Sequence, residues 1–135
     1  MSYDLVVFDA AVAPHDRGAF EAWFGEQTGW REDHSYDDPA VCTTGLRAWF
    51  FDIIERFPPM NGPYVRESTA DYDPDDDPRM TDYAIGRHLI QAGFAYSESE
   101  AALESVMELS DKHGLGIVSF NEKSFDAFLP DGTPI

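Results

Sequence analysis

The stretch WREDHSYDDP, residues 30–39, places a histidine among acids in a segment expected to connect two helices. A histidine beside a carboxylate can act as a general base, and two histidines with a carboxylate can bind zinc or another transition metal. His34 with Asp33 or Asp37 is therefore a candidate for catalysis. His88, at the start of a predicted strand, would join them only if the connecting loop folds over the end of a sheet.

No motif enforces this chemistry, because the sequence contains no HExxH, no CxxC pair and no His-x-His. It also lacks G-x-S-x-G, P-loop and G-x-G-x-x-G signatures, which are the motifs typical of serine hydrolases and of nucleotide-binding proteins. Cys42 is the only cysteine, and its position beside Val41 favours core packing over a nucleophile. An enzyme is thus less favoured than a binding protein, and we expect no cofactor.

A second polar run, DYDPDDDPRMTD, spans residues 71–82 and is dense in carboxylates. Four aspartates occupy positions 1, 3, 5 and 12 of this window, the oxygen-ligand spacing of an EF-hand loop. Position 6 is Asp76 instead of the glycine that the sharp turn needs, and prolines stiffen the interior. We therefore expect a solvated acidic loop, with a cation site as the alternative. The candidate metal ligands are Asp71, Asp73, Asp75 and Asp82.

Acidity is the strongest property of the whole composition, with 26 Asp and Glu against 9 Lys and Arg and a formal net charge of −17. Such a chain repels phosphate and anionic lipid, so we expect neither nucleic-acid nor membrane binding. A basic protein or a cation is the favoured partner. The acidity could instead be a habit of the whole proteome, and the sequence leaves both explanations open. The candidate partner-binding residues are Tyr36, Asp37, Asp38, Asp73, Asp75, Asp76 and Asp77.

The length of 135 residues and a hydrophobic fraction of 43% predict a single domain over residues 1–135. The start MSYDLVVFDA has no basic region followed by a long apolar run, and no stretch of about 18 apolar residues follows it. The expected location is cytoplasmic. The sequence leaves open whether the protein is a monomer or a homodimer.

The first half of the chain predicts one strand and two helices. The apolar run LVVF, residues 5–8, predicts a buried strand. A helix follows with Asp16 as its N-cap and Gly29 as its C-terminal stop. The strongest helical period runs from 46 to 57 and ends before two prolines.

The second half predicts strands at 83–85, 88–96 and 115–120. A capping box of Ser97 and Glu100 should begin a helix that ends at Gly114. Residues 64–82 are expected to form a long acidic loop that could carry a short strand at 64–66, and residues 121–135 an irregular tail. The resulting order, β-α-α-β-β-α-β, predicts an α+β, ferredoxin-like two-layer sandwich with its helices on one face of a mainly antiparallel sheet.

The segments YDLVVFD, WREDHSYDDP, FPPMNGP, TDYAIGRHLI and FAYSESEAALE together resemble a group of small acidic bacterial proteins without an assigned activity. That resemblance spans residues 3 to about 120 and implies no functional residues. In composition alone the chain is similar to immunity proteins, which neutralise basic toxins.

Three hypotheses follow from these features. The preferred one is an acidic protein-binding module, of immunity or inhibitor type, for a basic partner. One alternative is a small metal-dependent or acid–base enzyme that uses the region of His34 and His88. Another is a ligand-binding or dimeric ferredoxin-like domain, with aromatic side chains around a cleft. Those aromatic residues are Trp49, Phe50, Phe94 and Tyr96.

Overall fold

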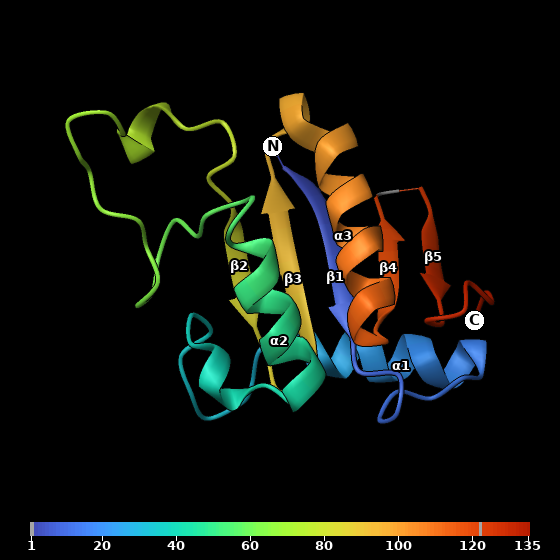
Figure 1. The fold of residues 1–135 in the computed structure, drawn as a ribbon. Helices are drawn as coiled ribbons and strands as arrows, with labels where there is room; N and C mark the ends of the chain where they lie inside the picture. Colours follow the sequence, from blue (N-terminus) through green and yellow to red (C-terminus); the bar gives the residue numbers. More distant parts are fainter. Residues whose placement is uncertain (1, 122) are drawn as a thin grey trace.

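A computed structural model describes residues 2–121 and 123–135, and within them the chain is an α+β protein (Figure 1). Five strands form one antiparallel sheet in the order β2-β3-β1-β4-β5, with three α-helices packed on it. The elements are β1 (Tyr3–Phe8), α1 (Arg17–Gln27), α2 (Thr44–Ile53), β2 (Asp82–Ile85), β3 (Leu89–Phe94), α3 (Ser99–His113), β4 (Gly116–Phe120) and β5 (Phe125–Phe128). No helix in the described part of the chain is both long enough and apolar enough to cross a membrane.

Strand β1 is the centre of the sheet and is covered on both faces. It pairs with β3 on one side and with β4 on the other. Leu5 and Val7 point to one face, while Val6 and Phe8 point to the other, and all four are at most 1% exposed. An uninterrupted apolar run is what a strand buried on both faces requires, so the prediction from LVVF is confirmed.

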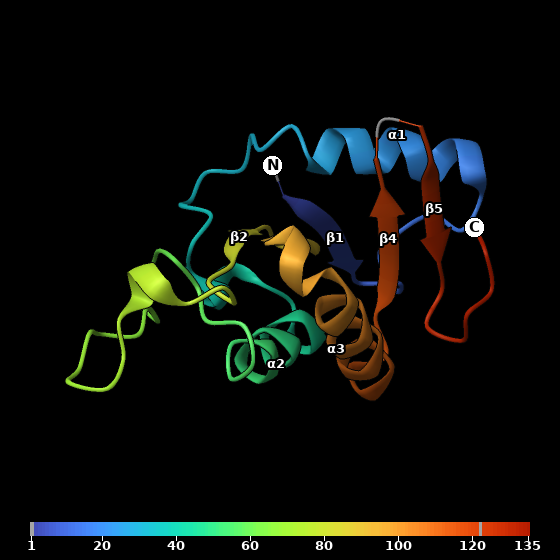
Figure 2. The ribbon, with the colours of Figure 1, turned by 90° about the horizontal axis from the view of Figure 1, so that it is seen from above.

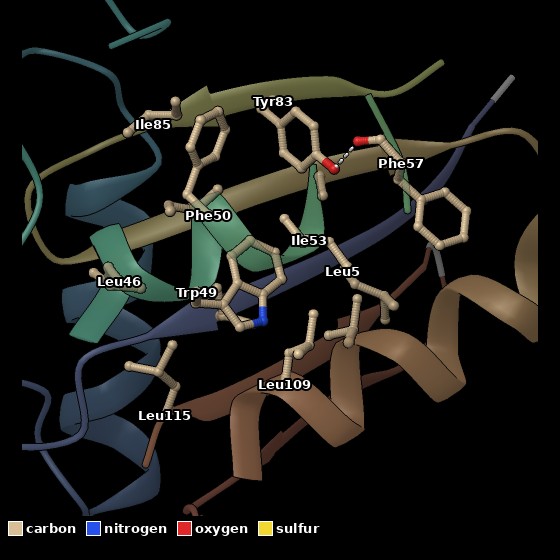
Figure 3. Close-up of a cluster of buried hydrophobic side chains, with 14 of the residues drawn as sticks. Leu5, Leu46, Trp49, Phe50, Ile53, Phe57, Tyr83, Ile85, Leu109 and Leu115 are labelled. Carbon is tan, nitrogen blue, oxygen red and sulfur yellow. Dashed lines mark hydrogen bonds between the residues drawn. The ribbon is translucent and has the colours of Figure 1, made fainter. Parts of the chain in front are cut away.

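Helices α2 and α3 cover one face of the sheet and enclose the larger core (Figure 3). Trp49, Phe50 and Ile53 of α2 project onto β1, β2 and β3, and each is at most 1% exposed. The hydroxyl of Tyr83 donates a 2.7 Å hydrogen bond to the carbonyl oxygen of Phe57, so its polar atom is satisfied inside this core. The helical period predicted for residues 46–57 therefore marked the correct buried face, although α2 itself ends at Ile53.

Helix α1 lies on the opposite face, so the expectation that all helices cover one face is wrong (Figure 2). Phe20 of α1 is fully buried against Phe8 of β1, with ring centroids 5.0 Å apart. Arg17 ties the helix to the end of the chain by donating a 2.7 Å hydrogen bond to the carbonyl oxygen of Phe125. The apolar spacing of this helix predicts a buried side, but it carries no information about which sheet face that side will meet.

Three predicted element ends differ from the structure. After α1 the left-handed residue is Trp30, with φ of 53°, and Gly29 is not the one that adopts this conformation. Helix α3 begins at Ser99 without a side-chain cap, so the predicted capping box with Ser97 does not form. Its C-terminal stop at Gly114, with φ of 66°, is confirmed.

The region expected to be an irregular tail contains strand β5. Its outer edge is covered by the last residues, because the amide of Ile135 donates to the carbonyl oxygen of Ala127 at 2.9 Å. The edge of β2 is covered in the same way, by Tyr36 at one end and by Pro58 at the other. Both edges of the sheet are thus partly blunted against pairing with another chain. No strand forms at residues 64–66.

Candidate functional site

The segment 30–38 folds against the turn between β2 and β3. The carbonyl oxygen of Tyr36 accepts a 2.9 Å hydrogen bond from the amide of Ile85, at the end of β2. The ring of Tyr36 stands edge-on to those of Trp30 and His34, with centroids 5.2 and 4.8 Å away. Its hydroxyl accepts from the amide of Glu32 at 2.7 Å. The stretch is therefore a packed corner of the protein, and Tyr36 is a structural residue within it.

Both ring nitrogens of His34 face hydrogen-bond acceptors. Nε2 lies 2.5 Å from Oε1 of Glu32, and Nδ1 lies 2.7 Å from the carbonyl oxygen of Ser35. A neutral imidazole has one N–H and can satisfy only one of these acceptors, whereas the imidazolium satisfies both. The carbonyl of Ser35 and the carboxylate of Glu32 accordingly raise the pKa of His34. A histidine held in this form has no free nitrogen with which to take a proton from a substrate.

The acid that partners His34 is Glu32, and not Asp33 or Asp37 as the sequence suggested. Burial raises the pKa of Glu32, but the hydrogen bonds from His34 and from the backbone amide of Arg87 outweigh it, so the pKa is lowered. Gly86 makes room for this carboxylate, because a Cβ at that position would lie 3.2 Å from Oε2 of Glu32. Gly86 is the one sequence feature that could have indicated that another side chain closely approaches the turn between β2 and β3.

The other predicted catalytic residues are not joined to His34 by hydrogen bonds. His88 is half-buried, and its Nδ1 has no hydrogen-bond partner among the described residues. Asp33 is exposed and Asp37 half-buried, and neither makes a side-chain hydrogen bond within residues 2–121 and 123–135. Across the same ranges no three His, Cys, Asp or Glu side chains are placed to hold a metal ion.

The acidic loop, residues 64–82, projects from the body of the protein beside β2 (Figures 1 and 2). Its two arginines point back to that body. Arg66 donates to the carbonyl oxygens of Ile54 and Glu55 at 3.2 and 2.9 Å. Arg79 pairs with Glu98 at 2.7 Å, and its guanidinium lies 4.9 Å from the ring centroid of Phe57. The positive charges of the loop are thus used to anchor it, and they leave its outer surface to the carboxylates.

The aspartates of this loop divide into structural and free groups. Asp73 accepts from the amide of Asp75 and caps a short 3₁₀ turn over residues 74–76. Asp77 accepts from the Tyr72 hydroxyl at 2.8 Å and from the amide of Arg79 at 2.9 Å. The carboxylates of Asp71, Asp75 and Asp76 are in exposed residues and form no salt bridge in the described part of the chain. These three carboxylates therefore face solvent with their negative charge unneutralised, and exposed Asp73, whose hydrogen bond comes from a backbone amide, adds a fourth.

The remaining candidates lie away from this free group. Asp38 accepts from the amide of Ala40 at 2.9 Å and begins another 3₁₀ turn, so its role is local. Asp82 starts β2 and lies on the sheet face that α1 covers in part, at the side near β2 that α1 leaves open. The aromatic set proposed for a ligand cleft is mainly core: Trp49, Phe50 and Phe94 are 1% exposed, and Tyr96 is 54% exposed.

Sequence reasoning missed a cleft on the open side of that face. It has a volume of about 450 Å³, and β1, β2 and β3 form its floor beside Trp30. No pattern in the sequence revealed it, because it exists only where α1 packs over β4 and β5 and leaves the β2 side of the sheet open. A scan against protein-family models, a search of curated proteins and a search of solved structures each found no match to this chain.

Proposed function

We propose that this protein is an acidic protein-binding module, of inhibitor or immunity type, that captures a basic protein through the loop at residues 64–82. The observation that supports it is the separation of charges in this loop. Arg66 and Arg79 are turned toward the body, whereas Asp71, Asp75 and Asp76 face solvent without a salt bridge in the described residues. Those carboxylates are free to meet a cationic surface.

The net charge of the loop is large enough to affect the rate of association with a basic protein. Residues 67–82 contain seven acids against one arginine, a net charge of −6. A local charge of this size accelerates association with a basic surface and loses its effect as salt shortens the Debye length to about 8 Å. The local hydrogen bonds of Asp73 and Asp77 restrain residues 72–79 of the loop, which reduces the ordering cost of binding there.

The acid–base enzyme is less well supported, because His34 uses both ring nitrogens in contacts with Ser35 and Glu32. We also infer that β1, α2, β2, β3, α3 and β4 form a ferredoxin-like unit to which α1 and β5 are added. The antiparallel strand order β2-β3-β1-β4 supports this assignment.

Quantitative capture from the native lysate with three baits tests the proposed function. The baits are the wild type, a loop variant with Asp71, Asp75 and Asp76 changed to Asn, and a control with Glu26→Gln, Glu104→Gln and Asp111→Asn. All three control positions are exposed, and the control changes the net charge by the same amount.

We expect a basic protein that the wild type and the control retain at low salt, that salt releases, and that the loop variant does not retain. If all three baits retain the same proteins, or none retains a basic one, the proposal is wrong.

A further inference from the structure

The cleft near β2, on the sheet face that α1 covers in part, is lined by carboxylates and by apolar side chains. Its floor is made of small residues, with Ala84 on β2 and Gly93 on β3, so backbone and short side chains leave the space open. Asp4 and Asp82 flank Gly93, with Met80 and Phe94 close to them along the chain, and Trp30 lies beside the turn between β2 and β3. The full lining is Ser2, Asp4, Trp30, Met60, Met80, Asp82, Ala84, Gln91, Gly93, Phe94 and Ala95. A volume of about 450 Å³ lies within the range of about 300–1,000 Å³ that small-molecule sites occupy.

Strand register sets two carboxylates on either side of Gly93. Asp4 of β1 and Asp82 of β2 are both directly opposite Gly93 of β3, so all three residues point to the same face. The carboxylate of Asp4 leans over the glycine, because a Cβ at position 93 would lie 3.0 Å from its Oδ1. Neither aspartate forms a salt bridge in the described part of the chain. Gly93 thus lies between two carboxylates that no salt bridge neutralises, and the Asp4 carboxylate, which accepts a 2.8 Å hydrogen bond from the Ser2 hydroxyl, lies close to the position that a side chain at 93 would take.

Another part of the cleft is built around Trp30. Its ring lies above the turn between β2 and β3, where a Cβ on Gly86 would lie 3.8 Å from Cζ3. Gly86 is four residues from Asp82 along the chain, a separation of about 13 Å in extended backbone. The left-handed backbone at Trp30 places this indole beside the cleft. The aromatic surface and the carboxylate pair therefore line the same cleft at different positions along β2.

We propose that this cleft binds a small organic cation, with an ammonium or guanidinium group between Asp4 and Asp82 and an apolar or aromatic group against Trp30. Charge-assisted hydrogen bonds to two carboxylates recognise the cation, and the indole of Trp30 provides the apolar surface. A metal ion fits less well, since calcium takes about six to eight oxygen ligands and no third carboxylate joins the pair among the described residues. The inference does not depend on the proposed function, because the free aspartates of the acidic loop do not line the cleft.

Calorimetric titration with a series of phenylalkylamines, carrying two to six methylene groups, tests this assignment. Each amine is compared with the phenylalkanol of equal length, which lacks the charge. We expect each amine to bind at least about tenfold more tightly than its alcohol, because the charge-assisted contacts are lost in the alcohol. Affinity should rise with chain length until the phenyl ring reaches Trp30.

Three variants locate the binding in the cleft. Asp82→Asn should weaken amine binding about tenfold, as expected for loss of one charge-assisted hydrogen bond. Asp75→Asn, with the same change of charge in the acidic loop, should leave it unchanged. Trp30→Leu should keep the preference for amines and remove the dependence on chain length. Thermal unfolding of each variant shows whether it is folded before titration.

Equal binding of amines and alcohols would overturn the proposal, as would equal losses in Asp82→Asn and Asp75→Asn. Failure of every amine to bind at millimolar concentration would overturn it too. None of these results would bear on capture of a basic protein by the loop, so the two proposals fail separately.

Discussion

Nε2 of His34 lies 2.5 Å from Oε1 of Glu32, at the corner where residues 30–38 meet the turn between β2 and β3. The side chain of His34 is 11% exposed and that of Glu32 is 20% exposed, so water screens the pair only in part. With the carbonyl of Ser35 as the second acceptor, the fold favours the protonated form of this histidine.

This arrangement predicts that stability depends on pH through His34. The folded pKa is raised above the unfolded value of about 6.5, so its stabilising contribution is complete below that value and is lost as pH rises through the folded pKa. We expect His34→Gln to remove about 1 kcal/mol at pH 5.5 and less at pH 9. Urea unfolding of both proteins across this range measures the difference. A destabilisation by His34→Gln that is the same at both pH values would contradict the assignment.

Close packing between β1 and β4 gives a second prediction. Gly116 is buried, and a Cβ there would lie 2.1 Å from Cζ of Phe8, which is itself fully buried. Gly116→Ala should therefore destabilise the protein by about 3 kcal/mol or more, since the ring cannot move within the close-packed core. Denaturant unfolding gives the value.

A double-mutant cycle supplies the control. Phe8→Leu alone should be destabilising, but in the Phe8→Leu background the alanine at 116 should cost much less, because the clash is gone. Equal costs of Gly116→Ala in the two backgrounds would show that the ring is not the obstacle.

The sequence predicted most elements, because their signals are local. The period of Leu46, Trp49, Phe50 and Ile53 and the glycine at 114 report a helix face and a helix end directly. The local sequence does not determine which face of the sheet α1 covers. It depends on contacts such as the hydrogen bond from Arg17 to the carbonyl of Phe125, more than a hundred residues away.

The sequence predicted which residue types the candidate site contains, but not which carboxylate pairs with the histidine. The segment 30–38 does bring a histidine onto a carboxylate, yet spacing alone could not choose Glu32 over its neighbouring aspartates. The choice is made by the amide of Arg87 and by the space that Gly86 leaves, and both belong to a turn distant in sequence. The cleft beside Trp30 escaped prediction for the same reason.

Cys42 provides a third prediction, on reactivity. The thiol is 3% exposed and donates to the carbonyl oxygen of Gly86 at 3.3 Å, and burial raises its pKa to about 12. Because the thiolate is the reactive form, an aromatic disulfide reagent at pH 8 should label the protein only at the rate of its unfolding. Labelling should become immediate in denaturing urea. Rapid labelling of the native protein would contradict a buried thiol.

Association kinetics test the central claim most directly. The association rate constant of the captured basic protein is measured against ionic strength for the wild type, the loop variant with Asp71, Asp75 and Asp76 changed to Asn, and the control variant of equal charge. We predict that the wild type and the control share a steep fall with salt, while the loop variant starts slower and falls less. The same salt dependence in all three proteins would contradict capture through the acidic loop.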